Sequence, residues 1–136
     1  MIRKIVPDVI SGQTLCTIRP EETVRTAARL MRERKVAAVL VMEGDRLAGI
    51  LSQGDCAIRV LLEGRDARAT KVSEIMTANP MTVKPDDHLE SCMGLMANRN
   101  FRHLPVLDGD KVVGVVSIGD LVKDVIRKLG DQVSYL

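Results

Sequence analysis

Two copies of a short polar motif hold the residue types that could do chemistry in this chain. They read GILSQGD at residues 49–55 and GVVSIGD at residues 114–120. In each copy an apolar run ends at a serine and a helix-like apolar pattern follows the aspartate, so the motif predicts a strand-to-helix turn. Glycine in such a turn leaves room for another group to approach the backbone, while serine and aspartate present oxygen atoms at a helix start. These features suit a polyol or a phosphate group.

The same spacing also has a purely structural explanation. Ser-x-x-Asp before an apolar run is a helix capping box, in which the two side chains satisfy backbone N–H groups and no ligand is needed. A single copy of the motif favours the cap. The ligand interpretation gains weight because the motif is duplicated within a longer repeat.

The repeat covers most of the chain without a gap. Its period is 65 residues, the shift that carries Thr17 onto Thr82. The same shift superposes Pro20 on Pro85, Leu30 on Leu95, Met31 on Met96, Arg34 on Arg99, Val41 on Val106, Gly44 on Gly109, Asp45 on Asp110, Val60 on Val125 and the two polar motifs. A period this long that occurs only twice indicates a duplicated unit with pseudo-twofold symmetry and not a solenoid.

Each repeat predicts the element order β-α-β-β-α. Strands are expected at residues 15–18, 37–42 and 47–51 and at residues 81–83, 103–107 and 112–116, with the turns EGDR and DGDK closing two hairpins. The first helix of each repeat has an apolar stripe at i, i+3, i+4 and i+7, which is Val24, Ala27, Ala28 and Met31 or Leu89, Cys92, Met93 and Met96. A turn or short helix is expected at residues 4–10 and again at 72–76.

The fold class that follows is α+β, with two tandem β-α-β-β-α repeats packed with pseudo-twofold symmetry. Each repeat is too small to bury a sizeable core alone, so we expect the two sheets to pack together. The second helix of the second repeat, at residues 121–129, has a wide apolar stripe formed by Leu121, Val122, Val125, Ile126 and Leu129.

Composition limits the classes of function. The chain has 136 residues, 46% hydrophobic and 28% charged, which is typical of a globular protein. It has one Phe, one Tyr and no Trp, so it offers little for base stacking. The net charge is +2, with 20 basic and 18 acidic residues mixed along the chain. A nucleic-acid partner is therefore disfavoured.

The cysteines and the hydropathy bear on location. Cys16, Cys56 and Cys92 form no CxxC pair, so neither a disulfide framework nor a zinc ribbon is expected. No stretch approaches the roughly 20 apolar residues that span a bilayer, and the N-terminus lacks the apolar core of a signal peptide. We expect a soluble, cytoplasmic protein without a membrane partner.

The chain resembles a known family, the CBS (cystathionine β-synthase) domain pair, also called a Bateman module. The resemblance rests on SEIMTANPMTV at residues 73–83, FRHLPVLDGDKVVGVVS at 101–117 and SIGDL at 117–121. The first repeat carries the pattern less fully, with VAAVLV where the second has RHLPV. The resemblance divides the chain into a first CBS motif at residues 8–63, a linker at 64–72, a second motif at 73–129 and a tail at 130–136.

The resemblance implies a stand-alone regulatory module that binds adenosine-containing ligands in two clefts between the motifs. Such ligands are AMP, ADP, ATP, S-adenosylmethionine or NAD, of which AMP is our first choice, and no cofactor is required. An ionised aspartate can accept hydrogen bonds from both ribose hydroxyls, which assigns the ribose to Asp120 and, in the other cleft, to Asp55. The ligand-binding positions carried over are Thr82, Val83, Arg102, His103, Leu104, Pro105, Ser117 and Asp120 with Thr17, Ile18, Ala38, Val39, Ser52 and Asp55.

Roles for the remaining positions follow from the same resemblance. Ser117 and Ser52 would reach the sugar or phosphate, and backbone groups around Val83 and Leu104 would read the adenine edge. Pro105 removes one donor from its strand, which keeps that strand near a sheet edge or leaves neighbouring carbonyls free.

The resemblance also implies a homodimer formed through the helices after Ser52 and Ser117, and a regulated protein of unidentified nature. A different class of function stays open, which is an interaction scaffold whose nucleotide sites are degenerate and empty. An enzyme is the weakest alternative, because the sequence has no catalytic triad, metal set or phosphate-transfer loop of the GxxxxGK type.

Other chemistry-bearing residues have plainer explanations. His88 and Cys92 are four apart but lack further metal ligands nearby, and His103 has no nucleophile partner. The methionines Met31, Met93 and Met96 are expected in the core. A charged helix face formed by Arg25, Arg29, Arg32 and Arg34 with Glu33 is expected to be solvated, with a phosphate contact from one arginine as the alternative.

The two predicted clefts are not equivalent. Arg102 and His103 correspond, at the shift of 65, to Ala37 and Ala38. Arginine can direct two hydrogen bonds onto a phosphate, whereas alanine offers only a methyl group and backbone. We therefore expect tighter binding of a phosphorylated ligand around Asp120 than around Asp55, unless Arg99 or Arg34 serves the other cleft.

Overall fold

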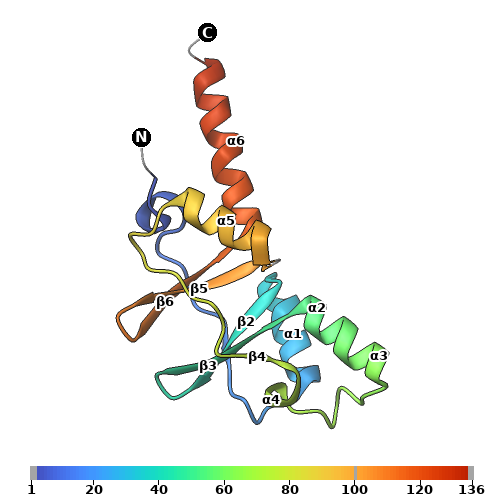
Figure 1. The fold of residues 1–136 in the computed structure, drawn as a ribbon. Coiled ribbons are helices and arrows are strands. Elements are labelled where there is room, and N and C mark those ends of the chain that lie inside the picture. Colours follow the sequence, from blue (N-terminus) through green and yellow to red (C-terminus); the bar gives the residue numbers. More distant parts are fainter. Residues whose placement is uncertain (1–2, 100, 135–136) are drawn as a thin grey trace. The chain divides into compact units, whose positions relative to one another are not determined.

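The computed structural model describes residues 3–99 and 101–134, with side chains through residue 130, and the chain packs into two compact units. The repeat-1 unit comprises Leu15–Pro80. The repeat-2 unit combines Met1–Thr14 with Met81–Leu136. Figure 1 shows that both units are built from helices and short strands, as the α+β class predicts.

The repeat-1 unit contains a four-stranded sheet in the order β1-β2-β3-β4. Strand β1 (Thr17–Ile18) is parallel to β2 (Ala38–Glu43), whereas β3 (Arg46–Ser52) is antiparallel to β2 and to β4 (Thr77–Ala78). Helix α1 (Val24–Arg34) precedes β2. A continuous helical segment follows β3 as α2 (Gln53–Asp55), the π-helical η2 (Cys56–Val60) and α3 (Leu61–Glu63), and the short α4 (Val72–Ile75) leads into β4.

The repeat-2 unit contains a two-stranded sheet of β5 (His103–Asp108) and antiparallel β6 (Lys111–Ser117). Helix α5 (Leu89–Arg99) precedes the hairpin and α6 (Ile118–Ser134) follows it. The N-terminal segment adds the turn η1 (Ile5–Val9), in which Val6 has an extended backbone. The strand predicted at residues 81–83 is wrong, because only Val83 makes an isolated parallel bridge, to Val106. Its counterpart in the other repeat does form β1.

Both hairpins have the predicted two-residue turns. Glu43 pairs with Arg46 and Asp108 pairs with Lys111, which leaves Gly-Asp as the central dipeptide in each case. The glycines Gly44 and Gly109 have φ values of 60° and 62°. Glycine tolerates this left-handed backbone at the first central position of a tight hairpin, so both turns use the residue that their geometry needs.

The first helix of each repeat buries a narrower stripe than the sequence predicts. Val24, Ala27 and Met31 are buried, and so are their counterparts Leu89, Cys92 and Met96. The i+4 position is exposed in both helices, so the core placement of Ala28 and of Met93, which is 41% exposed, is wrong. The core of a unit this small contacts only one narrow side of the helix, and the i+4 residue lies beyond that contact.

The two cores repeat the same positions. Most core residues of one unit correspond to those of the other at the shift of 65, as the duplication predicts. The repeat-1 core is Ile18, Val24, Ala27, Met31, Val39, Val41, Ala48, Leu51, Val72 and Ile75, and the repeat-2 core is Ile5, Ile10, Val83, Leu89, Cys92, Met96, Leu104, Val106, Val116 and Leu121.

The packed units differ from a division along the sequence. Residues 8–14, which the division along the sequence assigns to the first motif, pack with the second repeat. Residues 73–80, which it assigns to the second motif, pack with the first repeat. In the repeat-1 unit β4 pairs with Gly49 and Ile50. At the corresponding edge of β6, the side-chain amide of Gln13 takes the place of a strand, since its Oε1 accepts from Val115 N at 2.7 Å and its Nε2 donates to Val115 O at 3.0 Å.

One ion pair ties the N-terminal segment to α6. The Arg3 guanidinium donates from Nε to Asp124 Oδ2 at 2.8 Å and from Nη2 to Asp124 Oδ1 at 2.5 Å. The side chain of Asp124 is 1% exposed and that of Arg3 is 30% exposed. A bidentate guanidinium is the partner that such a buried carboxylate needs, because an uncompensated buried charge is strongly unfavourable.

We predict that Arg3→Ala lowers the free energy of unfolding by about 2 kcal/mol or more, somewhat below the roughly 3–5 kcal/mol of a fully buried pair because Arg3 is partly solvated. Chemical denaturation of both proteins measures this difference. The control is Arg46→Ala, which breaks the exposed Arg46–Glu43 pair and should change stability by no more than about 0.5 kcal/mol. Equal effects of the two substitutions would contradict the prediction.

Candidate functional site

The two polar motifs form the strand-to-helix turns that the sequence predicts. Ser117 is the last residue of β6, and Asp120 lies in the first turn of α6. Ser117 N donates to Asp120 Oδ2 at 2.9 Å, and Asp120 N donates to Ser117 Oγ at 3.1 Å. The capping interpretation of the motif is thus confirmed for this turn.

The turn at Ser52 and Asp55 has the same reciprocal bonds. Ser52 N donates to Asp55 Oδ2 at 3.0 Å, and Asp55 N donates to Ser52 Oγ at 3.2 Å. All four side chains are half-buried, so each turn is open to solvent on one side. Both motifs therefore act as helix caps, whatever else they do.

The caps leave polar atoms unused at both turns. Within the described part of the chain, neither Asp120 Oδ1 nor Asp55 Oδ1 accepts a hydrogen bond. A carboxylate oxygen has two lone pairs, so each aspartate can accept bonds from a ligand without giving up its cap. Capping and ligand binding are compatible functions of one side chain.

The glycines inside the turns are not required by the packing of the units. A Cβ at Gly54 would lie 3.7 Å from Ser52 Oγ, and one at Gly119 would lie 3.5 Å from Ser117 Oγ, which are ordinary contact distances. Gly49 is different, because a Cβ there would come within 2.7 Å of the Thr77 carbonyl oxygen. A Cβ would therefore fit at Gly54 and Gly119, and the packing of the unit does not explain why glycine stands there.

The two turns differ in the use of the serine hydroxyl. Ser52 Oγ donates to Asp55 Oδ2 at 3.0 Å, so its hydrogen is committed within the turn. In the turn at Ser117 the described residues provide no acceptor for the corresponding hydroxyl hydrogen. Ser117 can therefore donate to a ligand at no local cost, whereas Ser52 would first have to break its bond.

The hairpin geometry places Arg102 and His103 beside the turn at Ser117. His103 is the cross-strand partner of Ser117, and Ile118 N donates to the Arg102 carbonyl at 2.9 Å. Arg102 is exposed and His103 is half-buried. The residues expected to hold a phosphate thus lie at the start of β5, next to the aspartate turn.

The same register holds in the repeat-1 unit. Ala38 pairs with Ser52, Val39 pairs with Leu51, and Gln53 N donates to the Ala37 carbonyl at 2.9 Å. Alanines therefore occupy the places of Arg102 and His103 beside this turn, as the repeat alignment predicted.

The strand β5 has Val83 on its other side. Val83 N donates to the Pro105 carbonyl at 3.0 Å, and the Val83 carbonyl accepts from Leu107 N at 2.9 Å. The proline nitrogen, which cannot donate, thus lies in a strand with little further pairing, and the edge position predicted for Pro105 is confirmed. Because the N–H of Val83 is already used, only the second lone pair of its carbonyl and the exposed Thr82 next to it remain for a ligand.

The counterparts in the repeat-1 unit lie in regular strand pairing. Thr17 is exposed and pairs with Leu40, while Ile18 is 4% exposed and pairs with Val41. Leu104 and Val39 are buried, so only their backbone could meet a ligand.

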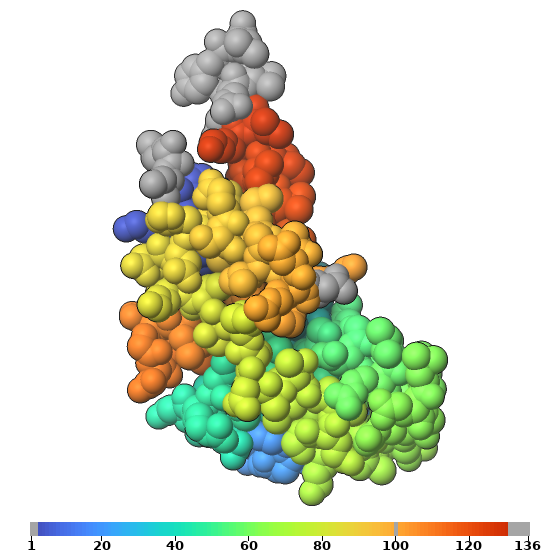
Figure 2. Space-filling view, in the orientation of Figure 1, coloured from blue at the N-terminus to red at the C-terminus, as the bar shows by residue number. Residues whose placement is uncertain are grey.

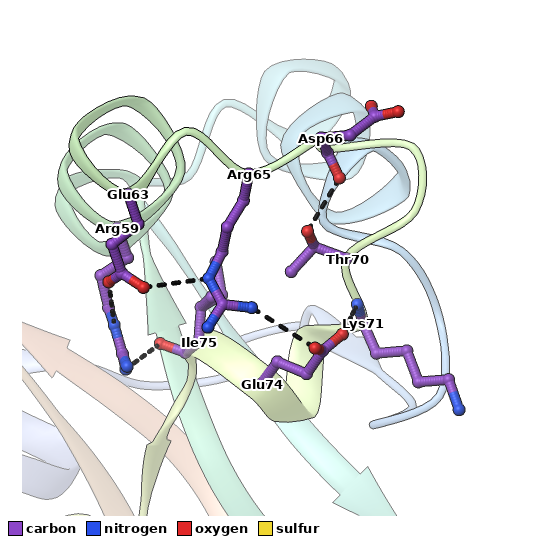
Figure 3. A network of polar contacts seen from close by, with 8 residues as sticks. All are labelled: Arg59, Glu63, Arg65, Asp66, Thr70, Lys71, Glu74 and Ile75. Atoms are coloured by element: carbon purple, nitrogen blue, oxygen red, sulfur yellow. Dashed lines mark hydrogen bonds and ion pairs between the residues drawn. The ribbon is translucent and has the colours of Figure 1, made fainter.

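A polar network fixes the helix that follows Asp55 (Figure 3). Arg59 Nη1 donates to the Ile75 carbonyl at 3.1 Å, and Arg65 bonds both to Glu63 at 3.0 Å and to Glu74 at 3.3 Å. The hydrogen bond from Arg65 lowers the pKa of Glu63. Only one part of this network has a signal in the sequence, which is the i, i+4 spacing of Arg59 and Glu63.

His88 and Cys92, which are four residues apart in the sequence, lie in different environments. His88 is exposed, whereas Cys92 is 0% exposed in the repeat-2 core. Burial, with a smaller effect from the charge of Asp87, raises the pKa of the Cys92 thiol to about 11, which disfavours the thiolate that a metal would need. In the part of the chain that the structure describes, no group of three or more His, Cys, Asp or Glu side chains is placed to hold a metal ion.

The fold and the two turns define a class of protein, a tandem module of two duplicated α+β motifs, each with a capped serine-aspartate turn at the end of a hairpin. The CBS-domain family model matches residues 1–61 and 72–127. The chain belongs to the CBS-domain family.

Relatives of similar length support the assignment. CBS domain-containing protein YhcV of Bacillus subtilis is 38% identical over 116 residues, which cover 85% of this chain and 81% of YhcV. A solved protein with CBS domains from Burkholderia ambifaria MC40-6 is 42% identical, with a TM-score of 0.86 over 90% of this chain and 93% of that one. The CBS-domain containing protein ATU1752 from Agrobacterium tumefaciens is 29% identical, with a TM-score of 0.81 over 87% of this chain and 96% of its own.

Other relatives are much longer than the part they share with this chain. CBS domain-containing protein CBSCBSPB2 of Arabidopsis thaliana is 36% identical over 114 residues, which cover 83% of this chain but 21% of the relative.

The helices of the described residues include none that is long and apolar enough to cross a bilayer.

Proposed function

We propose that this chain is a regulatory module that binds an adenosine-containing ligand, AMP being the first choice, through the turn at Ser117 and Asp120. The observation that carries the proposal is the pair of open turns, in which each aspartate caps a helix with one carboxylate oxygen and keeps the other unused. A cap alone does not need the space in front of Gly119 or the unused hydroxyl of Ser117.

The residues around this turn suit the parts of a nucleotide. Asp120 Oδ1 accepts from the ribose hydroxyls, and Ser117 Oγ donates to the sugar or the phosphate. Arg102, which is exposed immediately before β5, pairs with the phosphate, and His103, the first residue of β5, lies beside it. The adenine edge meets backbone groups near Thr82, Val83 and Leu104.

One relative gives independent support for the ligand class. CBS domain protein PAE2072 from Pyrobaculum aerophilum was solved in complex with AMP, and it matches this chain with a TM-score of 0.73 at 22% identity. Likeness at this identity concerns the fold, so the choice of AMP rests on the residues of the turn.

The proposal assigns no catalytic step to the chain. The free thiols of Cys16, Cys56 and Cys92 agree with a cytoplasmic location.

The second candidate is an interaction scaffold whose sites are empty. The commitment of the Ser52 hydroxyl to Asp55 and the alanines beside it favour this function for the repeat-1 turn. Thermal unfolding separates the two, because a ligand that binds the folded state must raise the melting temperature. AMP at millimolar concentration should do so for a nucleotide sensor and leave a scaffold unchanged.

We predict that Asp120→Asn weakens AMP binding at least about tenfold, since a hydrogen bond to a charged acceptor contributes roughly 1.5–3 kcal/mol. Asparagine keeps a neutral oxygen that can cap Ser117 N, so the fold should persist, and circular dichroism checks this. The matched control is Asp55→Asn, which makes the same change at the other turn. Calorimetry that finds unchanged AMP affinity in folded Asp120→Asn would refute the assignment of the ribose.

The two turns should differ in affinity, because Arg102, His103 and the free hydroxyl of Ser117 have no equivalents at Asp55. We predict that an Arg102→Ala, His103→Ala double variant loses about tenfold or more in AMP affinity, while Arg99→Ala changes it less than about threefold. Titration of the wild type should find one tighter site. Two equal sites, or an unaffected double variant, would show that the difference has no role in binding.

We also propose a homodimer, supported by apolar side chains that each unit leaves at its surface on the helix after the motif. These are Ile58, Leu61 and Leu62, exposed by 60%, 77% and 81%, and Ile118, Val122, Ile126 and Leu129, exposed by 41%, 49%, 61% and 55%. Figure 2 shows both segments at the surface in this view, residues 56–63 in green and α6 in red. Apolar stripes of this kind are typical of helices that pack against a partner.

Light scattering should therefore give the mass of a dimer at micromolar concentration, with or without AMP. Ile126→Glu places a charge on the stripe and should shift the protein toward the monomer, because a buried unpaired carboxylate is strongly unfavourable. Lys123→Glu introduces the same side chain at the residue after Val122, outside the apolar stripe, and should leave the mass unchanged. A monomer mass for the wild type would end the proposal.

A further inference from the structure

The helix α1 carries an unpaired basic stripe formed by Arg25, Arg29 and Arg32. Positions i, i+4 and i+7 lie along one face of a helix, over about 10 Å. All three side chains are exposed, on a face of the helix separate from the buried Val24 and Met31. Among the described residues, none of the three guanidinium groups has a hydrogen bond or an ion pair.

The fold does not need these arginines. The corresponding positions of α5, at the shift of 65, are Glu90, Gly94 and Ala97, and α5 packs on its unit in the same way with Leu89, Cys92 and Met96 buried. The helices α1 and α5 thus pack in the same way with and without the arginine stripe. The stripe is a feature of the α1 surface that the fold does not require.

We propose that this face of α1 is a docking surface for an acidic helix of another protein, with carboxylates at the same i, i+4 and i+7 spacing. A second helix has the same pitch, so one glutamate or aspartate per turn meets one arginine per turn. Guanidinium groups bind carboxylates in a bidentate manner, which makes arginine more suitable than lysine for such pairs.

Other occupants fit the surface less well. The helices of residues 3–99 and 101–134 include none with carboxylates at this spacing on an exposed face, so a second copy of the chain does not supply the partner. The exposed large apolar side chains of the described residues lie outside α1, so this face has nothing to insert into a lipid bilayer. The chain has almost no aromatic residues and a net charge of +2, which disfavours nucleic acid.

The test is fluorescence anisotropy with a labelled alanine- and glutamine-based helical peptide that carries glutamates at i, i+4 and i+7. The wild-type protein should bind it at low salt and lose affinity as salt rises. A variant combining Arg25→Gln, Arg29→Gln and Arg32→Gln should bind about tenfold more weakly, given three exposed pairs. The control variant combines Lys111→Gln, Lys123→Gln and Arg127→Gln, which removes the same charge from exposed sites in the other unit, and it should bind within about twofold of wild type.

A peptide of the same composition with its three glutamates adjacent tests whether spacing is recognised, and it should bind about tenfold more weakly than the spaced peptide. Four results would overturn the proposal. These are no binding of the spaced peptide, equal binding of the two peptides, equal losses in the two variants, or stripe-dependent binding of a DNA oligonucleotide or phosphatidylserine vesicles that is tighter than peptide binding.

Discussion

Both candidate sites depend on how an open hairpin edge is closed. A two-stranded hairpin is marginal by itself, and its outer strand exposes unpaired backbone groups. In each unit one strand of the hairpin, β3 or β6, ends at the serine of the polar motif. The outer edge of that strand is closed by a segment that precedes the other repeat in the sequence. β4 pairs with β3 around Gly49, and the Gln13 amide pairs with Val115 in β6. These contacts hold the strand whose end carries Ser52 or Ser117, so each turn inherits its position from them.

Both repeats also have a glycine before the serine, Gly49 and Gly114. The close approach of the closing segments explains these two glycines. A Cβ at Gly114 would lie 2.8 Å from Gln13 Oε1 and 2.9 Å from Ile10 Cδ1, and one at Gly49 would meet Met76 Sδ and the Thr77 carbonyl at 2.7 Å. Glycine is therefore required where the closing segment crosses the strand, whereas Gly54 and Gly119 in the turns are free of such contacts. The motif thus contains one glycine that the packing of the unit requires and one that it does not.

Local patterns predicted the fold well where the determinant lies within a few residues. The hairpin turns need glycine at positive φ, and Gly44 and Gly109 supply it, so their sequences were sufficient. The capping bonds of Ser117 and Asp120 were likewise readable from spacing. Other features depend on contacts between residues far apart in the sequence, which a periodic pattern cannot predict. These are the packing of the segment before each repeat with the other repeat, the strand β4 and the exposure of Met93. The two serine-aspartate turns were predictable from the sequence, but the different use of the Ser52 and Ser117 hydroxyls appears only in the geometry.

Comparison of the two repeats separates the residues that the fold requires from those that it does not require. Positions that the fold needs are the same or similar in both repeats, as in the core pairs Ile10 and Ile75 or Met31 and Met96. Exposed positions that differ are not explained by the fold, because the other repeat folds without them. Arg102 has Ala37 as its counterpart, and Arg25 has Glu90. The two repeats thus keep the same or similar residues at their core positions and differ on two exposed surfaces, one beside the turn at Asp120 and one on α1.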